Sequence, residues 1–185
     1  MKTTDCFIDI ETTGTNPNTS AMFQIGAVKF NLMTGEIGET FKISLKMPKN
    51  RYWQEDTRRF WSSRLSLFNE IVKDEVDTEE GFRKFIEWVN KDTLNVRAWS
   101  KPLSFDLPFI ASYCEQYNIA NPFNHWEHRD LRSFMMAIYG ENLPKLTMKD
   151  GLVEHDALAD ALNETLWLLD TWKRRDEICK QQTKQ

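Results

Sequence analysis

Short apolar segments near the start of the chain have the alternating pattern of β-strands. Three such segments, separated by turn and loop residues that include Gly14 and Gly35, cover residues 4–10, 21–31 and 39–45. Short connections of this kind join antiparallel neighbours. This part of the sequence therefore predicts a three-stranded antiparallel meander.

From residue 56 onward the apolar residues recur at the spacing of amphipathic helices. Asp56 or Thr57 is the predicted cap of a first helix, which continues through Phe68. Further helices are predicted over residues 78–91, 107–117, 130–139 and 156–172, and short strands over residues 95–100 and 125–128. Pro108 is expected in the first turn of its helix, where a missing N–H group costs little.

The whole pattern predicts one domain over residues 1–175, followed by a polar tail over residues 176–185. A chain of 185 residues is long enough for one buried core. The predicted order of elements indicates an α/β fold: a meander comes first, helices follow, and a strand, a helix, a strand and a helix end the domain. In that fold helices flank a mixed five-stranded sheet with antiparallel and parallel strands.

Composition narrows the functional classes. The formal net charge of -4 argues against a protein that covers duplex DNA with a broad basic face. An enzyme that brings cations to a phosphate can nevertheless be acidic overall. Cys6, Cys114 and Cys179 lack metal-type spacing, so we expect reduced thiols and a cytoplasmic location. No apolar window of about 18 residues occurs, so no membrane partner is expected.

Asp9 and Glu11 are the first candidates for chemistry. They lie two residues apart at the end of the first predicted strand, so their side chains share one face and can share one cation. Acidic residues at a strand end are also commonly just solvated. Asp9, however, lies between Ile8 and Ile10 in a segment with an interior pattern, where a carboxylate needs a partner such as a metal ion.

Three more candidates lie near later elements. Asp106 follows a predicted strand at the sheet edge where α/β folds place ligands, although an acidic residue in a first helical turn also stabilises the helix dipole. Asp160 lies one turn into the final helix, flanked by Ala157 and Ala161, which allow a helix to approach a sheet closely. His155 precedes that helix, a position where histidine is more often a cap or surface residue than a base.

The order of these residues resembles the exonuclease superfamily called DEDDh or DnaQ-like. The likeness covers residues 4–172 and rests on three motifs: Phe7-Ile8-Asp9-Ile10-Glu11-Thr12-Thr13-Gly14, Ser104-Phe105-Asp106 and His155-Asp156-Ala157-Leu158-Ala159-Asp160-Ala161. Two further segments are similar to exonuclease A of T-even phages and to exonuclease VIII-like proteins: Asp56-Thr57-Arg58-Arg59-Phe60-Trp61 and His128-Arg129-Asp130-Leu131-Arg132. Many superfamily members carry Asn where this chain has Pro102, and the phage-type branch also lacks that Asn.

The resemblance implies a ribonuclease H-like fold and a two-metal-ion active site. The implied ligands of two Mg²⁺ (or Mn²⁺) ions are four carboxylates: Asp9, Glu11, Asp106 and Asp160. His155 is the implied general base that removes a proton from the attacking water, a task that suits an imidazole group near neutral pH.

The resemblance also implies how the substrate is held. Thr12 and Thr13 are expected at the terminal 3′-OH group of the nucleic acid. Phe60 and Trp61 are candidates for stacking on the last bases, although both side chains equally suit a core. A homodimer is a further expectation from the family.

These features predict a 3′-to-5′ exonuclease that releases nucleoside 5′-monophosphates from DNA, preferably single-stranded. The alternative is an exoribonuclease that trims RNA with the same site, because no residue is identifiable from the sequence as a reader of the 2′-OH group. A non-catalytic binding domain is disfavoured because all five chemical residues are present. A ribonuclease H-type endonuclease is disfavoured because His155 belongs to an exonuclease motif.

Overall fold

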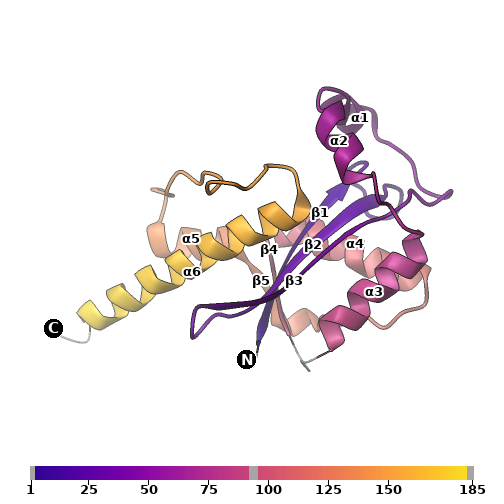
Figure 1. The fold of residues 1–185 in the computed structure, drawn as a ribbon. Coiled ribbons are helices and arrows are strands. Elements are labelled where there is room, and N and C mark those ends of the chain that lie inside the picture. Colours follow the sequence, from indigo (N-terminus) through magenta and orange to yellow (C-terminus); the bar gives the residue numbers. More distant parts are fainter. Residues whose placement is uncertain (1–2, 92–95, 183–185) are drawn as a thin grey trace.

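The computed structural model describes residues 3–91 and 96–182, and its centre is one mixed β-sheet (Figure 1). The strands are β1 (Asp5–Thr12), β2 (Met22–Asn31), β3 (Glu36–Ser44), β4 (Arg97–Ser100) and β5 (His128–Asp130). Their order in the sheet is β3-β2-β1-β4-β5. The first three form the predicted antiparallel meander, and β4 and β5 run parallel to β1. The predicted α/β class with a mixed five-stranded sheet is confirmed.

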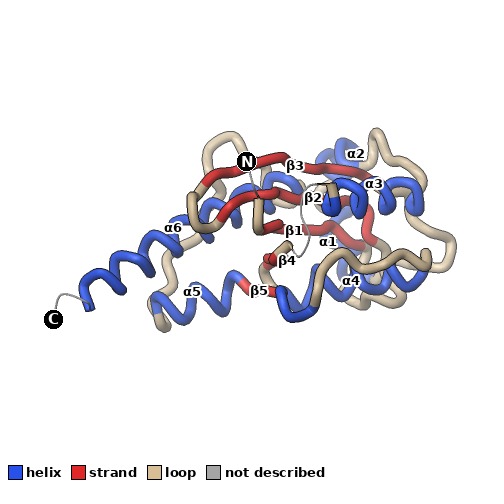
Figure 2. Tube along the Cα trace, turned by 90° about the horizontal axis from the view of Figure 1, so that it is seen from below, coloured by secondary structure: helices blue, strands red, loops and turns tan. Residues whose placement is uncertain are grey.

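Helices pack on both faces of the sheet (Figures 1 and 2). One face carries α3 (Thr78–Asn90) and α4 (Leu103–Gln116), and the other carries α5 (Leu131–Tyr139) and α6 (Ala157–Gln182). Successive β1 side chains alternate between the two cores, with Ile8 toward α3 and α4 and Phe7 toward α5 and α6. Asp9 and Glu11 therefore share the face on which α6 lies. None of the described helices is long and apolar enough to cross a membrane.

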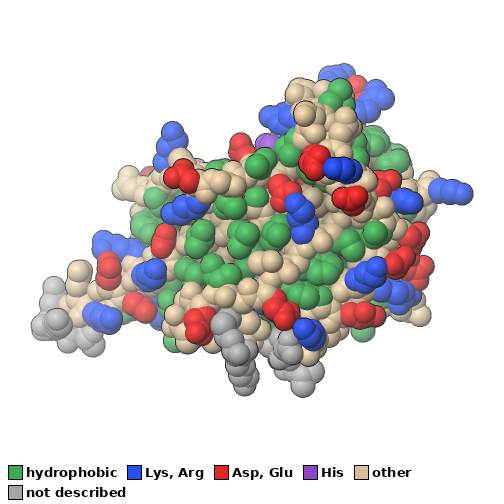
Figure 3. Space-filling model, in the orientation of Figure 1, with side chains coloured by type: hydrophobic (Ala, Val, Ile, Leu, Met, Phe, Trp, Pro, Cys, Tyr) green, Lys and Arg blue, Asp and Glu red, His purple; other side chains and the backbone are tan. Residues whose placement is uncertain are grey.

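Two short helices, α1 (Glu55–Ser62) and α2 (Leu65–Ile71), project at the end of the sheet where β1 finishes (Figure 1). They close over an aromatic cluster in which the ring of Phe23 lies 5.1 Å from Trp61 and 5.4 Å from Phe68, between ring centroids. Lys and Arg side chains surround this end of the molecule (Figure 3). The α1–α2 hairpin, residues 55–71, thus has an apolar inner side and a charged outer side.

The predicted helix that continues through Phe68 is wrong in two respects. The structure divides it at Ser63 and Arg64 into α1 and α2, and its cap is Gln54 rather than Asp56 or Thr57. The strand predicted over residues 125–128 is also wrong, because His125–Glu127 forms a 3-10 turn and the strand is the next segment, β5. Asn95, at the start of another predicted strand, lies outside the described residues.

Two helix ends differ from the prediction, and for the start of α4 the reason is not local. α4 begins at Leu103 rather than at residue 107, because Asp130 Oδ2 accepts a hydrogen bond from the Leu103 N–H group at 2.8 Å and caps the helix from another strand. Pro108 consequently lies inside the helix. Asp130 also caps α5, as predicted, through Ser133 N–H at 2.6 Å. At the other end of the chain, α6 continues to Gln182 through residues predicted to form a polar tail.

The start of α6 approaches β2 more closely than a side chain would permit. A Cβ atom on Gly26 would lie 2.1 Å from the carbonyl carbon of Ala157. The Ala157 N–H group donates to Gln24 Oε1 at 2.8 Å, which fixes the helix end on the strand. Because Gly26 pairs with Asp9 in the ladder of β1 and β2, this contact sets α6 directly beside Asp9.

Replacing Gly26 with Ala should push α6 away from the sheet, because the added methyl group meets backbone atoms that cannot rotate aside. We expect the free energy of unfolding to fall by about 1–3 kcal/mol, measured by urea denaturation. Gly81→Ala is the matched control, since its Cβ would meet side-chain atoms of Leu45 and Val76 at 2.4 and 2.8 Å, and those can move. A loss no larger than that of Gly81→Ala would contradict the role given to Gly26.

Candidate active site

Three elements bring the predicted catalytic residues to one cavity of about 290 Å³. β1 supplies Asp9 and Glu11, α4 supplies Asp106, and the start of α6 supplies Asp160. His155, in the loop that leads into α6, lines the same cavity. All five residues predicted to carry the chemistry therefore meet at one place, at the end of β1.

Asp106 completes an open edge of β1. The parallel pairing of β1 with β4 covers only Asp5 to Phe7, because β4 has four residues. Beyond that point the N–H group of Ile10 donates to Asp106 Oδ1 at 3.2 Å. The carboxylate takes the place of a neighbouring strand, so its position is fixed by the backbone of the strand that carries Asp9 and Glu11.

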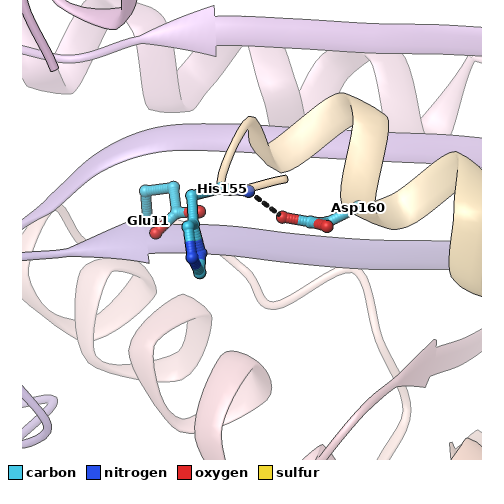
Figure 4. Close-up of side chains that lie close together, drawn as sticks. All are labelled: Glu11, His155 and Asp160. Atoms are coloured by element: carbon cyan, nitrogen blue, oxygen red, sulfur yellow. Dashed lines mark hydrogen bonds between the residues drawn. The ribbon is translucent and has the colours of Figure 1, made fainter. Parts of the chain in front are cut away.

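His155 and Asp160 are joined through the main chain. The His155 N–H group donates to Asp160 Oδ2 at 2.8 Å, and His155 adopts a positive φ of 65° (Figure 4). This left-handed conformation is unusual for a residue other than glycine, and such conformations cluster at functional sites. Glu11, His155 and Asp160 each offer a ligand atom within 4.8 Å of the others. These three groups, which face one another in Figure 4, form the most compact part of the site.

Phe60 and Trp61 differ in burial and in their distance from the active site. Trp61 is only 3% exposed and belongs to the aromatic cluster under the α1–α2 hairpin, so its burial supports the core role that the sequence left open. Phe60 is half-buried, and its ring packs edge-on against the His155 imidazole at 4.9 Å between centroids. The Arg64 guanidinium lies 3.8 Å from the centroid of the same Phe60 ring. Phe60 thus connects the hairpin to the active site.

The hydroxyl groups of Thr12 and Thr13 hold their own loop. Thr13 Oγ1 donates to the Tyr52 carbonyl at 2.9 Å and accepts from the Ala21 N–H group at 2.8 Å. Thr12 Oγ1 donates to the Gly14 carbonyl at 2.8 Å. Both residues are buried. They stabilise the loop that follows Glu11, and Thr12 Oγ1 retains lone pairs with which it can accept a further hydrogen bond.

The carboxylates of the cavity strongly disfavour each other's ionisation. Burial raises the pKa of Asp9 and of Glu11 well above their ordinary values, and neighbouring carboxylates raise both further. Burial, followed by the charge of Glu164, raises the pKa of Asp106 to about 8. Burial also raises the pKa of Asp160, against the opposing hydrogen bond from His155. Nearby positive charge would relieve this repulsion.

Three charged residues of the cavity were not identified from the sequence: Lys101, Glu154 and Glu164. Glu164 lies one turn after Asp160 on α6 and is 5% exposed, and Lys101, which follows β4, forms an ion pair with it. The four-residue spacing from Asp160 is a signal that helical periodicity offers for Glu164. Lys101 has no comparable signal, because its position depends on where β4 ends.

This set of side chains fits divalent cations. The donors are carboxylate oxygens with one imidazole and no thiolate, which suits Mg²⁺ or Mn²⁺ rather than a structural zinc ion. Bound cations would neutralise the charge that raises the pKa values of Asp9, Glu11 and Asp106. The residues that could hold them are the four predicted ligands, Asp9, Glu11, Asp106 and Asp160.

Comparison with known proteins shows the family to which the chain belongs. The family model of the 3′-5′ exoribonuclease Rv2179c-like domain matches residues 4–172, and the chain belongs to this family. It is therefore a nuclease, which is a hydrolase. No curated protein matches the chain in a sequence search.

Solved exonuclease structures share the fold at low sequence identity. The nuclease domain of 3′hExo, described as a DEDDh family member and bound to rAMP, has a TM-score of 0.65 and 19% identity, over 91% of this chain and 90% of that one. Escherichia coli Exonuclease I in complex with a dT13 oligonucleotide has a TM-score of 0.68 and 14% identity, over 95% of this chain. The chain spans only 42% of that protein and 39% of Exonuclease I from Methylocaldum szegediense.

The metal-free protein should lose stability as the pH rises. The pKa of Asp106 is about 8 in the folded protein against an ordinary 3.8, so the folded state holds a proton that the unfolded state releases. The Asp106 contribution is fully present below pH 3.8 and is lost as the pH rises through about 8. Unfolding temperatures measured in EDTA across this range should fall, and Asp106→Asn should flatten the decline.

Asp5→Asn provides the contrasting control for this pH experiment. Burial alone would raise the pKa of Asp5, but hydrogen bonds from Arg97, Thr4 and Trp99 outweigh burial and hold it below its ordinary value. Removing this charge should therefore destabilise the protein near neutral pH, whereas Asp106→Asn should stabilise it. Destabilisation by both substitutions at pH 8 would contradict the charge repulsion inferred for the cavity.

Proposed function

We propose that this protein is a metal-dependent 3′-to-5′ exonuclease that removes nucleoside 5′-monophosphates from the 3′ end of a single-stranded nucleic acid. The observation that carries the proposal is the meeting of Asp9, Glu11, Asp106, Asp160 and His155 around one cavity at the end of β1. The match to an exoribonuclease domain family supports the same reaction. Within the superfamily, the sequence motifs favour the branch of phage exonuclease A and exonuclease VIII-like proteins.

The four carboxylates would hold two divalent cations, Mg²⁺ or Mn²⁺, and these would supply the positive charge that binds the scissile phosphate. Such cations, when bound, activate water and stabilise the charge that develops on the leaving 3′ oxygen. Asp9 and Glu11 would contact the cations from the rigid sheet. Asp106 is fixed to the same strand by the hydrogen bond from the Ile10 N–H group. Asp160 lies on the first turn of α6, the helix that covers the face of the sheet shared by Asp9 and Glu11.

His155 acts as the general base in this proposal. Its imidazole lies beside Glu11 and Asp160, and its orientation is fixed by the main-chain hydrogen bond to Asp160 and by the ring of Phe60. A base at this position can accept the proton of a water molecule that attacks the phosphorus atom. Because the Glu11, His155 and Asp160 donors are so close, the imidazole is also a candidate cation ligand, and substitution separates the two roles.

The 3′ end of the substrate enters beside the α1–α2 hairpin. Phe60 is the aromatic side chain placed next to His155, so it can stack on the last base or wedge against it. The loop of Thr12 and Thr13 follows Glu11 directly, and we assign it to the terminal 3′-OH group. Arg58 and Arg59 form ion pairs with Glu55, and exposed pairs of this kind are weak enough for phosphates to displace.

RNA and DNA are both candidate substrates. The description of the matched family favours RNA, which is the alternative that the sequence left open. The sequence motifs and the fold shared with Exonuclease I, bound to dT13, favour single-stranded DNA. We place RNA first, since the family match covers residues 4–172 of this chain whereas the structural likeness is at 14% identity.

An end-labelled oligonucleotide assay tests the activity. A single strand with a 5′ label should shorten into a ladder in Mg²⁺ or Mn²⁺ and stay intact in EDTA, because the carboxylates require cations to hold the phosphate. A 3′-phosphate or a circular strand should resist, since neither offers a free 3′-OH group. RNA and DNA of one sequence, compared at equal concentration, rank the substrates. Efficient cutting of circles would instead indicate an endonuclease.

His155→Asn should separate the base from the cation ligands. Asn tolerates the left-handed backbone at this position, and the hydrogen bond to Asp160 comes from the main chain and is retained. Turnover should fall by about 10²–10⁴ while Mn²⁺ affinity, measured by calorimetry, stays near that of the parent protein. Asp160→Asn should reduce both quantities. If His155→Asn loses Mn²⁺ affinity as severely as Asp160→Asn does, the imidazole is a cation ligand.

A further inference from the structure

Glu164 is a further carboxylate in the active-site cavity, outside the motifs that the sequence presents. It lies four residues after Asp160 on the same face of α6 and lines the cavity together with Asp9 and Asp106. Its side chain is nearly inaccessible, with 5% of the residue exposed. A buried carboxylate is costly unless each oxygen has a partner, so the surroundings of its two oxygens are informative.

The two oxygens of Glu164 have different environments. Oε1 accepts a hydrogen bond from the Lys101 ammonium group. Oε2 is buried and has no hydrogen-bond partner within the described part of the chain. An unpartnered buried carboxylate oxygen forfeits its hydration without compensation. Oε2 belongs to a side chain that lines the cavity, so a group bound in the cavity can supply the missing partner.

Lys101 is held in place rather than free to follow the substrate. Its Nζ atom lies 5.0 Å from the centroid of the Trp167 ring, one turn further along α6 than Glu164, and pairs with Glu164 on its other side. Among the described residues that line the cavity, it is the one Lys or Arg side chain. The ion pair therefore brings Glu164 into the cavity without adding net negative charge.

We propose that Glu164 is a positioning residue of the cation site: Lys101 neutralises one carboxylate oxygen, and the other, Oε2, accepts a hydrogen bond from a water molecule in the hydration shell of a bound divalent cation. Mg²⁺ and Mn²⁺ keep several waters when proteins bind them, and carboxylates just outside the ligand shell orient those waters. The inference rests on the proposed function, because it assumes that the four carboxylates bind such cations.

The test is a titration of the full chain with Mn²⁺ in the absence of nucleic acid, in which calorimetry measures the binding affinity. Glu164→Gln keeps the size of the side chain and an oxygen that can accept from Lys101, but it removes the charge and places a donor or a neutral acceptor toward the cation water. We expect Mn²⁺ affinity to fall by about 10- to 100-fold, the usual effect of losing a partner outside the ligand shell. An unchanged affinity would overturn the proposal.

Glu154→Gln is the matched control for charge alone. Glu154 lines the same cavity but is exposed to solvent, so the same substitution removes one negative charge without removing a buried oxygen. We expect it to change Mn²⁺ affinity by less than about threefold, as screened surface charges do. If Glu164→Gln and Glu154→Gln weaken binding equally, Glu164 acts only through the general field and the proposal fails.

Two further variants separate cation binding from folding. Glu164→Asp retains the charge and the fold but withdraws the carboxylate by one methylene, so it should also weaken Mn²⁺ binding; parental affinity would count against the proposal. Lys101→Met leaves Glu164 unneutralised, so it should lower the unfolding temperature in EDTA and raise Mn²⁺ affinity. A purely structural ion pair would instead give the same loss of stability in Lys101→Met and Glu164→Gln, with no change in affinity.

The outcome also distinguishes this inference from the proposed function. Asp9→Asn should abolish Mn²⁺ binding and exonuclease activity together if the proposed function is correct. If Asp9→Asn loses Mn²⁺ binding and activity but Glu164→Gln keeps the Mn²⁺ affinity of the parent protein, the role of Glu164 is refuted and the proposed exonuclease function stands. A parent protein that neither binds Mn²⁺ nor degrades single strands would refute the function itself.

Discussion

The active site exists because α6 can lie against the sheet with backbone touching backbone. Gly26 has no side chain at the point where Ala157 passes, and the Gln24 side chain accepts the first free N–H group of the helix. Protein interiors are packed too tightly to absorb an extra methyl group at such a contact. The distance of Asp160 from Asp9 and Glu11 is therefore set by a glycine that takes no part in chemistry.

The same close packing creates an electrostatic cost. Carboxylates that approach from β1, α4 and α6 raise one another's pKa values, and the fold holds them together against that repulsion. Arg97 and Asp5 show the opposite arrangement in the same sheet, where a buried carboxylate is fully hydrogen-bonded and its pKa is lowered. The first cluster suits binding of cations, and the second suits stability.

Much of the fold and the core of the site were predictable from the sequence. Strand alternation and helical spacing gave the sheet and most helices, and the spacing of Asp9 and Glu11 placed both carboxylates on one face. The convergence of Asp106 and Asp160 on these two carboxylates came from family resemblance, because strand order is a long-range property. The early start of α4 could not be predicted, since its cap, Asp130, belongs to a different strand. Lys101 was not predictable for a similar reason, because its role depends on a partner from a distant element, whereas Glu164 has a local signal in its four-residue spacing from Asp160.

The hydrogen bond from Ile10 to Asp106 gives the protein a built-in spectroscopic reporter. The chemical shift of an amide proton depends on the charge carried by its acceptor, and here the acceptor is a side chain of the active site. Because the pairing of β1 with β4 ends at Phe7, the Ile10 N–H group has a titratable carboxylate as its acceptor instead of a backbone carbonyl group. One resonance from the middle of a strand can follow proton and cation occupancy at Asp106, with no label on the substrate and no turnover.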